Sequence, residues 1–197
     1  IRFDLWMPVI ARDFDAAVDE LRDADGIVLD LRGNPGGVGA MAMGIAGHFV
    51  GDARSLGAMK TRENELRFVV NPRRVDTRGR PVAPYAGPVA ILTDALSLST
   101  SEIFAAGMQQ LGRARVFGET TGGQALPSYP RPLPSGDVLV HAFASFAMPD
   151  GAPVEGKGVV PDVAAPPTRA ELLAGRDPAL EAAKRWIAER RKGGASR

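Results

Sequence analysis

The chain has 197 residues, of which 45% are hydrophobic, enough for one sizeable core. Its 24 basic and 23 acidic residues leave a net charge of +1, and the scattered arginines form no basic stripe with interleaved aromatic residues, so we expect no nucleic-acid partner. The lack of cysteine excludes disulfides, thiolate catalysis and cysteine-ligated zinc, and no apolar run is long enough to span a bilayer.

The first part of the chain alternates strand and helix patterns. Residues 1–7 read as a strand, residues 13–24 as a helix with Asp13 at its N-cap, and residues 26–31 as a strand buried on both faces. A glycine-rich loop at residues 32–37 then leads into a second amphipathic helix. This alternation predicts an α/β domain.

The rest of the chain continues with shorter elements. We expect strands near residues 55–61 and 66–70, an exposed loop up to residue 87, a buried strand at 88–93 and a helix at 99–111. We expect further strands at residues 115–117 and 137–146 and a final helix around 180–187. The prediction is a single domain over residues 1–197, cut from a longer chain, with a helical appendage over about residues 168–197.

Ser99 lies at the junction between the strand predicted at 88–93 and the helix that follows it. A serine there is exposed on a sharp turn, and its oxygen faces the positive end of the helix, where negative charge is stabilised. Ser99 and Glu102 also have the spacing of a capping box, so helix capping alone explains this segment too.

Three other loops have compositions that suit a binding site. Residues 30–37 read Asp-Leu-Arg-Gly-Asn-Pro-Gly-Gly, and unhindered glycine N–H groups can bind an anion, although a plain tight turn has the same composition. Residues 118–123 and 150–162, taken alone, indicate only a surface loop and a hairpin that leads into a strand end.

Histidine is the usual base for a serine nucleophile, and the chain has two. His48 falls on the apolar face of its helix, which favours a core or boundary position, and His141 lies in the middle of a predicted strand. No group of histidines and carboxylates has the spacing of a metal site. We therefore expect neither a metal nor another cofactor.

In this order, the motifs resemble those of the tail-specific, or C-terminal-processing, protease family, which includes the tricorn protease core. The resemblance rests on residues 30–37, on Ser-x-Ser-Glu at 99–102, on Gly-Glu-x-Thr at 118–121 and on Gly-Val-Val-Pro-Asp at 158–162. It implies an α/β fold of the Clp protease and crotonase type, a spiral of β-β-α units.

The resemblance implies a serine endopeptidase that hydrolyses peptide bonds through an acyl-enzyme on Ser99 and processes protein C-termini. It places the oxyanion hole at the backbone N–H of Thr100 and at that of Gly36 or Gly37, an alternative that it leaves open. The expected partner is a polypeptide substrate, and an oligomer is compatible with the sequence. The tendency of the family predicts a periplasmic or other extracytoplasmic location.

The chain departs from many family members at the catalytic base. The lysine of the Ser–Lys enzymes is Gln124 here, which cannot accept the serine proton, and a glutamine four residues further on is Ser128. The tricorn-like branch uses a Ser-His-Ser-Glu tetrad, and Glu155 occupies the place of its glutamate, with the implied role of orienting and polarising the base. Because the histidine precedes the core in that branch, we expect the base upstream of Ile1 and little activity from this chain alone. Lys157 is the nearest alternative by motif, but nothing favours it.

Two other functions fit parts of the sequence. A non-catalytic relative that serves as a peptide- or lipid-binding module is compatible with the missing lysine. An acyl-CoA enzyme of the crotonase type would share the oxyanion hole, but it would leave the Ser-x-Ser-Glu block without a role.

Overall fold

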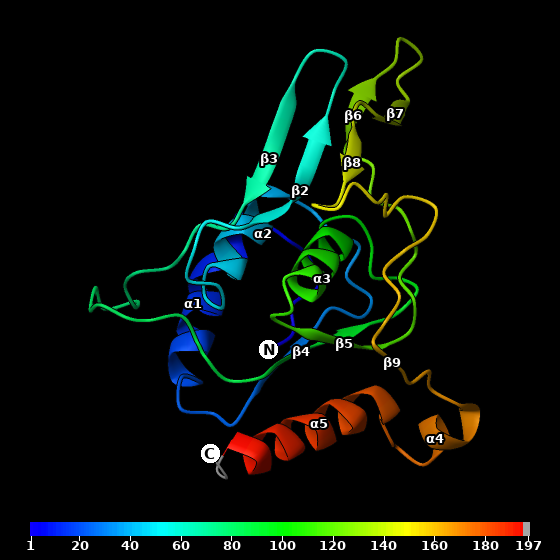
Figure 1. Cartoon of the computed structure of the whole chain (residues 1–197). Coiled ribbons are helices and arrows are strands. Elements are labelled where there is room, and N and C mark those ends of the chain that lie inside the picture. The colour runs from blue at the N-terminus through cyan, green and yellow to red at the C-terminus, as the bar shows by residue number, and fades with distance from the viewer. Residues whose placement is uncertain (195–197) are drawn as a thin grey trace.

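Four parallel strands form the central sheet of the computed structural model, which describes residues 1–194 (Figure 1). In sheet order they are β1 (Ile27–Asp30), β4 (Val89–Thr93), β5 (Arg115–Gly118) and β9 (Val163–Ala164). Every residue of β4 is buried, because helices cover both faces of the sheet. The strands predicted at residues 26–31, 88–93 and 115–117 are confirmed.

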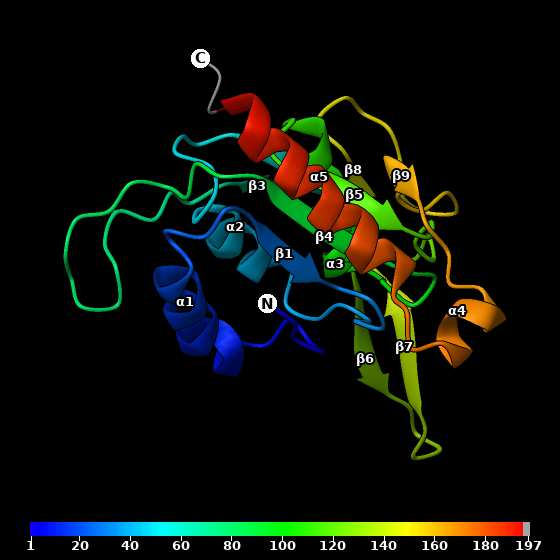
Figure 2. The same cartoon turned by 90° about the horizontal axis from the view of Figure 1, so that it is seen from below.

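The helices divide between the two faces of this sheet. One face carries α1 (Ala11–Glu20), α2 (Ala40–Ala46) and α3 (Thr100–Gln110), and the other carries α5 (Pro178–Gly194), which follows the short α4 (Arg169–Leu173) (Figure 2). Asp13 lies in the first turn of α1, so its predicted N-cap position is wrong. Within residues 1–194, no helix combines the length and the apolar character needed to cross a membrane.

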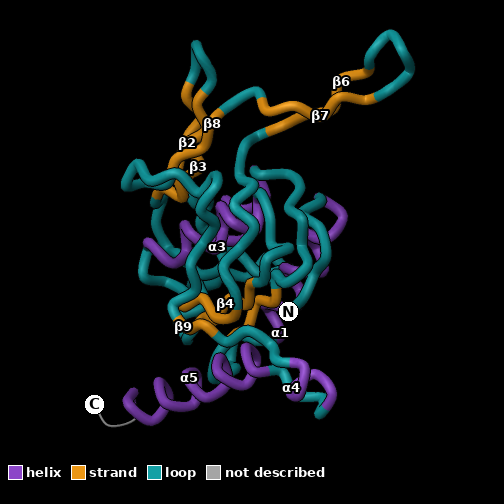
Figure 3. Tube along the Cα trace, turned by 90° about the vertical axis from the view of Figure 1, so that its right-hand side faces the viewer, coloured by secondary structure: helices purple, strands orange, loops and turns teal. Residues whose placement is uncertain are grey.

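Two antiparallel units project from the same end of the molecule (Figure 3). One is a three-stranded sheet of β3 (Glu65–Val69), β2 (Ser55–Lys60) and β8 (Ser145–Ala147), and the other is the hairpin of β6 (Ser128–Pro132) and β7 (Val138–Ala142). The single strand predicted at residues 137–146 is wrong, because β7 pairs with β6 whereas β8 pairs with β2. β6 contains two prolines, which are typical of loops and edge strands, and its sequence therefore did not indicate a strand.

The N-terminal segment is not the strand predicted at residues 1–7. It makes isolated bridges, one of which joins Trp6 to Gly37, and then enters the 3₁₀-helix η1 (Pro8–Ile10). The fully buried indole of Trp6 donates a hydrogen bond to Ser101 Oγ at 2.8 Å. These contacts hold the segment beside the glycine loop and the start of α3 instead of within a sheet.

His48 follows α2, which is shorter than the sequence pattern suggested. Its side chain is buried, and its Nε2 lies 2.8 Å from Asp15 Oδ1 on α1. The second oxygen of Asp15 accepts a hydrogen bond from Arg73 at 2.6 Å. The predicted core or boundary position of His48 is therefore confirmed, and its contact with Asp15 joins the end of α2 to α1.

Candidate active site

Ser99 stands where β4 turns into α3, and its backbone is strained. Its φ of +52° makes it the only non-glycine residue with a positive φ among the described residues. A conformation of this kind costs about 1–3 kcal/mol and persists where the surrounding structure enforces it, as in nucleophile elbows. An ordinary helix cap has an extended backbone without such strain, so capping alone does not account for Ser99.

The glycine loop after β1 lies directly against Ser99. Because β1 and β4 are parallel neighbours, the loops at their carboxyl ends meet. A Cβ atom on Gly36 would lie 2.6 Å from Ser99 Cβ and 3.0 Å from Thr100 N, so only glycine fits there. Thr100 Oγ1 donates a hydrogen bond to Gly37 O at 2.9 Å, which fixes the loop to the first turn of α3.

The two candidate glycine amides differ in their surroundings. The Gly36 N–H donates to Asn34 Oδ1 at 2.9 Å, so it is already engaged in the loop. The bridge to Trp6 uses the Gly36 carbonyl and the Val38 N–H, and the Gly37 N–H takes no part in it. Gly37 also lines the same cavity as Ser99, whereas Gly36 does not. The geometry therefore favours Gly37 over Gly36 as an anion-binding amide.

Glu102 is a fully buried carboxylate that fixes the backbone of Ser99. It accepts hydrogen bonds from the N–H of Ser99 (2.9 Å), the hydroxyl of Thr121 (2.6 Å) and the N–H groups of Gly123 (2.7 Å) and Gln124 (2.9 Å). These contacts extend beyond the capping box that the sequence indicated. The loop after β5 is thereby tied to the turn that carries Ser99.

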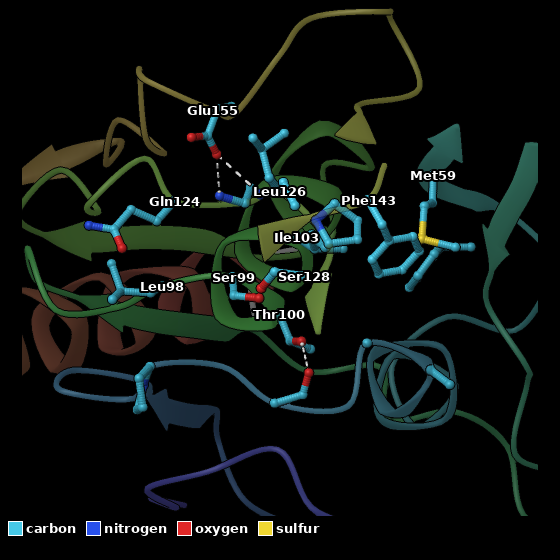
Figure 4. A pocket seen from close by; sticks show the side chains of 18 of the residues that line it. Met59, Leu98, Ser99, Thr100, Ile103, Gln124, Leu126, Ser128, Phe143 and Glu155 are labelled. Carbon is cyan, nitrogen blue, oxygen red and sulfur yellow. Dashed lines mark hydrogen bonds between the residues drawn. The ribbon is translucent and has the colours of Figure 1, made fainter. Parts of the chain in front are cut away.

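Glu155 reaches the same cavity from the segment before β9 (Figure 4). Its Oε2 accepts hydrogen bonds from the N–H groups of Ala125 (2.8 Å) and Leu126 (3.1 Å). The cavity has a volume of about 830 Å³, and Glu155 is the only charged residue among those that line it. The structure thus brings Ser99, Thr100, Gly37 and Glu155 to one cavity.

Histidine and lysine are absent from the residues that line this cavity. Gln124 and Ser128 do line the cavity. The main-chain carbonyl of Gln124 accepts a hydrogen bond from the Ser99 N–H at 3.1 Å. His141 lies on β7 with its ring against Tyr129, and Lys157 is exposed outside the lining. Across residues 1–194, no group of three or more histidines and carboxylates is arranged to hold a metal ion.

Arg32, the arginine of the glycine motif, has a structural position. It donates to Asp30 Oδ2 at 2.7 Å and to Asp177 Oδ1 at 2.9 Å, just before α5. The hydrogen bond that Arg32 donates to Asp30, and secondarily the one to Asp177, raise the pKa of the guanidinium despite its partial burial. Arg32 therefore connects the start of the glycine loop to the helix on the opposite face of the sheet.

Comparison with known proteins adds a family match. The model of Peptidase family S41 matches residues 2–165. A probable CtpA-like serine protease of Staphylococcus aureus strain COL is 30% identical over 154 residues, which cover 73% of this chain and 30% of the relative. Its counterpart in Staphylococcus epidermidis is 29% identical over 138 residues, covering 70% of this chain and 27% of the relative. The matched part of the chain thus spans less than a third of the length of these curated relatives.

Solved structures share the fold. A putative peptidase from Parabacteroides merdae has a TM-score of 0.79 at 21% identity, covering 94% of this chain and 59% of that one. The photosystem II D1 C-terminal processing protease has a TM-score of 0.67 at 23% identity, and the match covers 90% of this chain and 46% of that one. The tricorn protease has a TM-score of 0.61 at 25% identity, and the match covers 84% of this chain and 15% of that one. The α/β fold of the Clp protease type that the motifs predicted is confirmed.

Proposed function

The chain belongs to peptidase family S41, and from that premise we propose that it is the core of a serine peptidase with Ser99 as its nucleophile. The observation that carries the proposal is the strained Ser99 turn, which opens on the same cavity as the Gly37 amide and the first turn of α3. This is the arrangement that acyl transfer requires, because the serine oxygen and the oxyanion donors must reach the same carbonyl group.

The geometry supports a two-step hydrolysis. Ser99 Oγ attacks the peptide carbonyl and gives its proton to a base, while the N–H groups of Gly37 and Thr100 stabilise the oxyanion. The C–N bond then breaks, the amine leaves with the proton, and an ester to Ser99 remains. Water hydrolyses this ester and restores the hydroxyl. The N-terminus of α3 adds positive potential where the negative charge develops.

The base is the part of the machinery that the cavity lining does not provide. We therefore assign it to a histidine from a segment beyond the lining residues, as in the tricorn-like branch. Glu155 lies at the edge of the cavity with Oε2 held by two main-chain N–H groups, which leaves Oε1 to orient that base through a relay. Without such a base an unactivated serine is a weak nucleophile, so the isolated chain should be nearly inactive.

The proposed substrate is a polypeptide cleaved near its C-terminus, outside the cytoplasm. The alternative of a non-catalytic peptide- or lipid-binding module is less well supported, because a binding module gains nothing from the strain at Ser99.

Proteolysis by the full-length protein tests the proposal. The wild type and the Ser99→Ala variant are incubated with an unfolded protein, and new N-termini are identified by mass spectrometry. The wild type should produce fragments and the variant none, with equal circular dichroism spectra as the control for folding. Equal cleavage by both proteins would rule out Ser99 as the nucleophile.

A further inference from the structure

Six large apolar side chains in the lining of the Ser99 cavity are here called the apolar wall. They come from α2, from β2 and β3, from α3 and from the segment after β7, which are far apart in the sequence. The residues are Met43, Met59, Leu66, Phe68, Ile103 and Phe143. Two of the six are methionines, whose flexible thioether side chains adapt to differently shaped apolar groups.

Figure 4 shows how this wall is placed relative to Ser99. Ile103, Phe143 and Met59 follow one another away from Ser99 on one side, while Gln124 lies on the opposite side. Glu155, the single charged residue of the lining, lies apart from the apolar wall. Large apolar side chains therefore extend from Ser99 on one side, whereas Gln124 and Glu155 lie among Leu98 and Leu126 elsewhere in the lining.

We propose that the apolar wall selects substrates with a bulky apolar side chain, such as leucine, methionine or phenylalanine, next to the scissile bond. The inference rests on the proposed peptidase function and adds its substrate class. A leucine buried there gains the free energy of removing its apolar surface from water, whereas alanine gains much less. An aspartate would be desolvated there without a cation to pair with.

The expected discrimination follows from the size of the buried group. One methylene in an apolar pocket changes specificity by roughly tenfold or more, so the preference for leucine over alanine should be at least about tenfold. Aspartate should bind more weakly than alanine. Leucine, methionine and phenylalanine should bind within a few-fold of one another, because the wall includes adaptable methionines.

Peptide binding to the full-length Ser99→Ala protein tests the inference without requiring catalysis. The probes are fluorescein-labelled octapeptides of glycine, serine and alanine with one variable central residue, and the measurement is fluorescence anisotropy. The order leucine, methionine and phenylalanine above alanine, and alanine above aspartate, is the expected result. Equal affinities across the series, or no measurable binding of the leucine peptide, would overturn the inference.

Two charge insertions locate the selectivity on the apolar wall. Met59→Glu, at a half-buried position of β2, should remove the preference for leucine and improve the binding of a lysine peptide. Phe143→Glu, at a position that is 42% exposed, provides a second test with less risk to folding. The matched control is Leu173→Glu on α4, which is 77% exposed and outside the cavity lining.

The outcomes separate this inference from the proposed function. If both cavity variants retain the leucine preference of the Leu173→Glu control, the apolar wall does not set specificity, and the inference is wrong. That result would leave the nucleophile untouched, since it is tested by cleavage with and without the Ser99 hydroxyl. Conversely, selective binding combined with no proteolysis would support the apolar site and refute the peptidase.

Discussion

At the scale of single residues, the site depends on how closely Gly36 approaches the Ser99 turn. The family resemblance implied that Ser99, Thr100 and the glycine loop would meet, and in the structure the parallel neighbours β1 and β4 bring the loops at their carboxyl ends together. It could not choose between Gly36 and Gly37, because that choice depends on Asn34, whose carboxamide occupies the Gly36 amide. A side-chain contact of this kind is local in space but follows no sequence pattern.

Gly36→Ala should displace the nucleophile turn. Its Cβ would lie 2.6 Å from Ser99 Cβ and 2.9 Å from Leu98 O, at a φ of +100°. We expect a loss of more than about tenfold in proteolysis by the full-length protein, because a small displacement of reacting atoms is costly.

Gly33→Ala is the matched control for this substitution. Gly33 belongs to the same loop and has a φ of +72°, but no atom lies within 4 Å of its added Cβ. The Gly33→Ala variant should lose about 1–2 kcal/mol of unfolding free energy, because alanine is disfavoured in a left-handed backbone, and it should retain proteolytic activity. If the two variants had the same activity, the close approach of Gly36 to Ser99 would be irrelevant to catalysis.

At the scale of elements, the buried Glu102 connects α3 to the loop after β5. The sequence showed Glu102 as the second half of a capping box and as the glutamate of the Ser-x-Ser-Glu motif, but neither pattern contains information about its contacts with Thr121 and Gly123. Among the antiparallel elements, β2 and β3 match the strands predicted near residues 55–61 and 66–70, whereas β6 and β7 were harder to predict than the central sheet. These two strands are short and exposed, so β6 and β7 lack the continuous apolar run that identified β4.

Glu102→Gln should destabilise the chain and lower proteolysis by the full-length protein. A carboxamide replaces one acceptor oxygen by an NH₂ group that faces N–H donors, so buried donors lose their partners at a cost of about 2–4 kcal/mol. Glu171→Gln at the exposed capping box of α4 is the control, and it should change stability little. Equal urea denaturation midpoints for the two variants would contradict the connecting role of Glu102.

The pairing of α1 with the end of α2 predicts a pH dependence. Burial lowers the pKa of His48 from its ordinary value of 6.5, and the neighbouring Arg73 acts in the same direction, although Asp15 and Asp19 oppose them. The imidazole therefore binds its proton at higher pH in the unfolded chain than in the folded chain. Neutral His48 contributes fully to the free energy of unfolding above about pH 6.5, and this contribution is lost as the pH falls below that value.

Urea unfolding between about pH 7.5 and about pH 5.5 measures this effect. The His48→Gln variant, which retains a hydrogen-bond donor for Asp15, should lose less stability over that interval than the wild type. The control is His141→Gln in the exposed hairpin, which should follow the wild type. If the His48→Gln variant lost as much stability between the two pH values as the wild type, other groups would cause the pH dependence.

At the scale of the whole molecule, the sheet separates two cores, with α3 and the proposed Ser99 site on one side and α5 on the other. The apolar run of β4 predicted burial on both faces, and alternate β4 residues do belong to separate cores. The sequence pattern of α5 identified a helix but not its position, because an amphipathic face does not specify which surface it covers. The contacts of Arg32 with Asp30 and Asp177 show how α5 begins next to the glycine loop.

Ala183→Asp should test how much α5 contributes to the fold. Ala183 is fully buried against the sheet, so an aspartate there would place an unpaired carboxylate in the core at a cost of about 2–5 kcal/mol. Ala188→Asp, at an exposed position of the same helix, changes the helix propensity equally and should cost only about 0.5 kcal/mol. Thermal unfolding of both variants measures the difference, and equal values would show that α5 adds no core packing.

The central claim is that the Ser99 hydroxyl forms a covalent bond with the substrate carbonyl. The most direct test is to treat the full-length protein with a fluorophosphonate probe and to locate the modified residue by mass spectrometry. We predict a single modified residue, Ser99, and no modification in the Ser99→Ala variant. A probe attached to any other residue, or no labelling of a full-length protein that degrades unfolded substrates, would contradict the account.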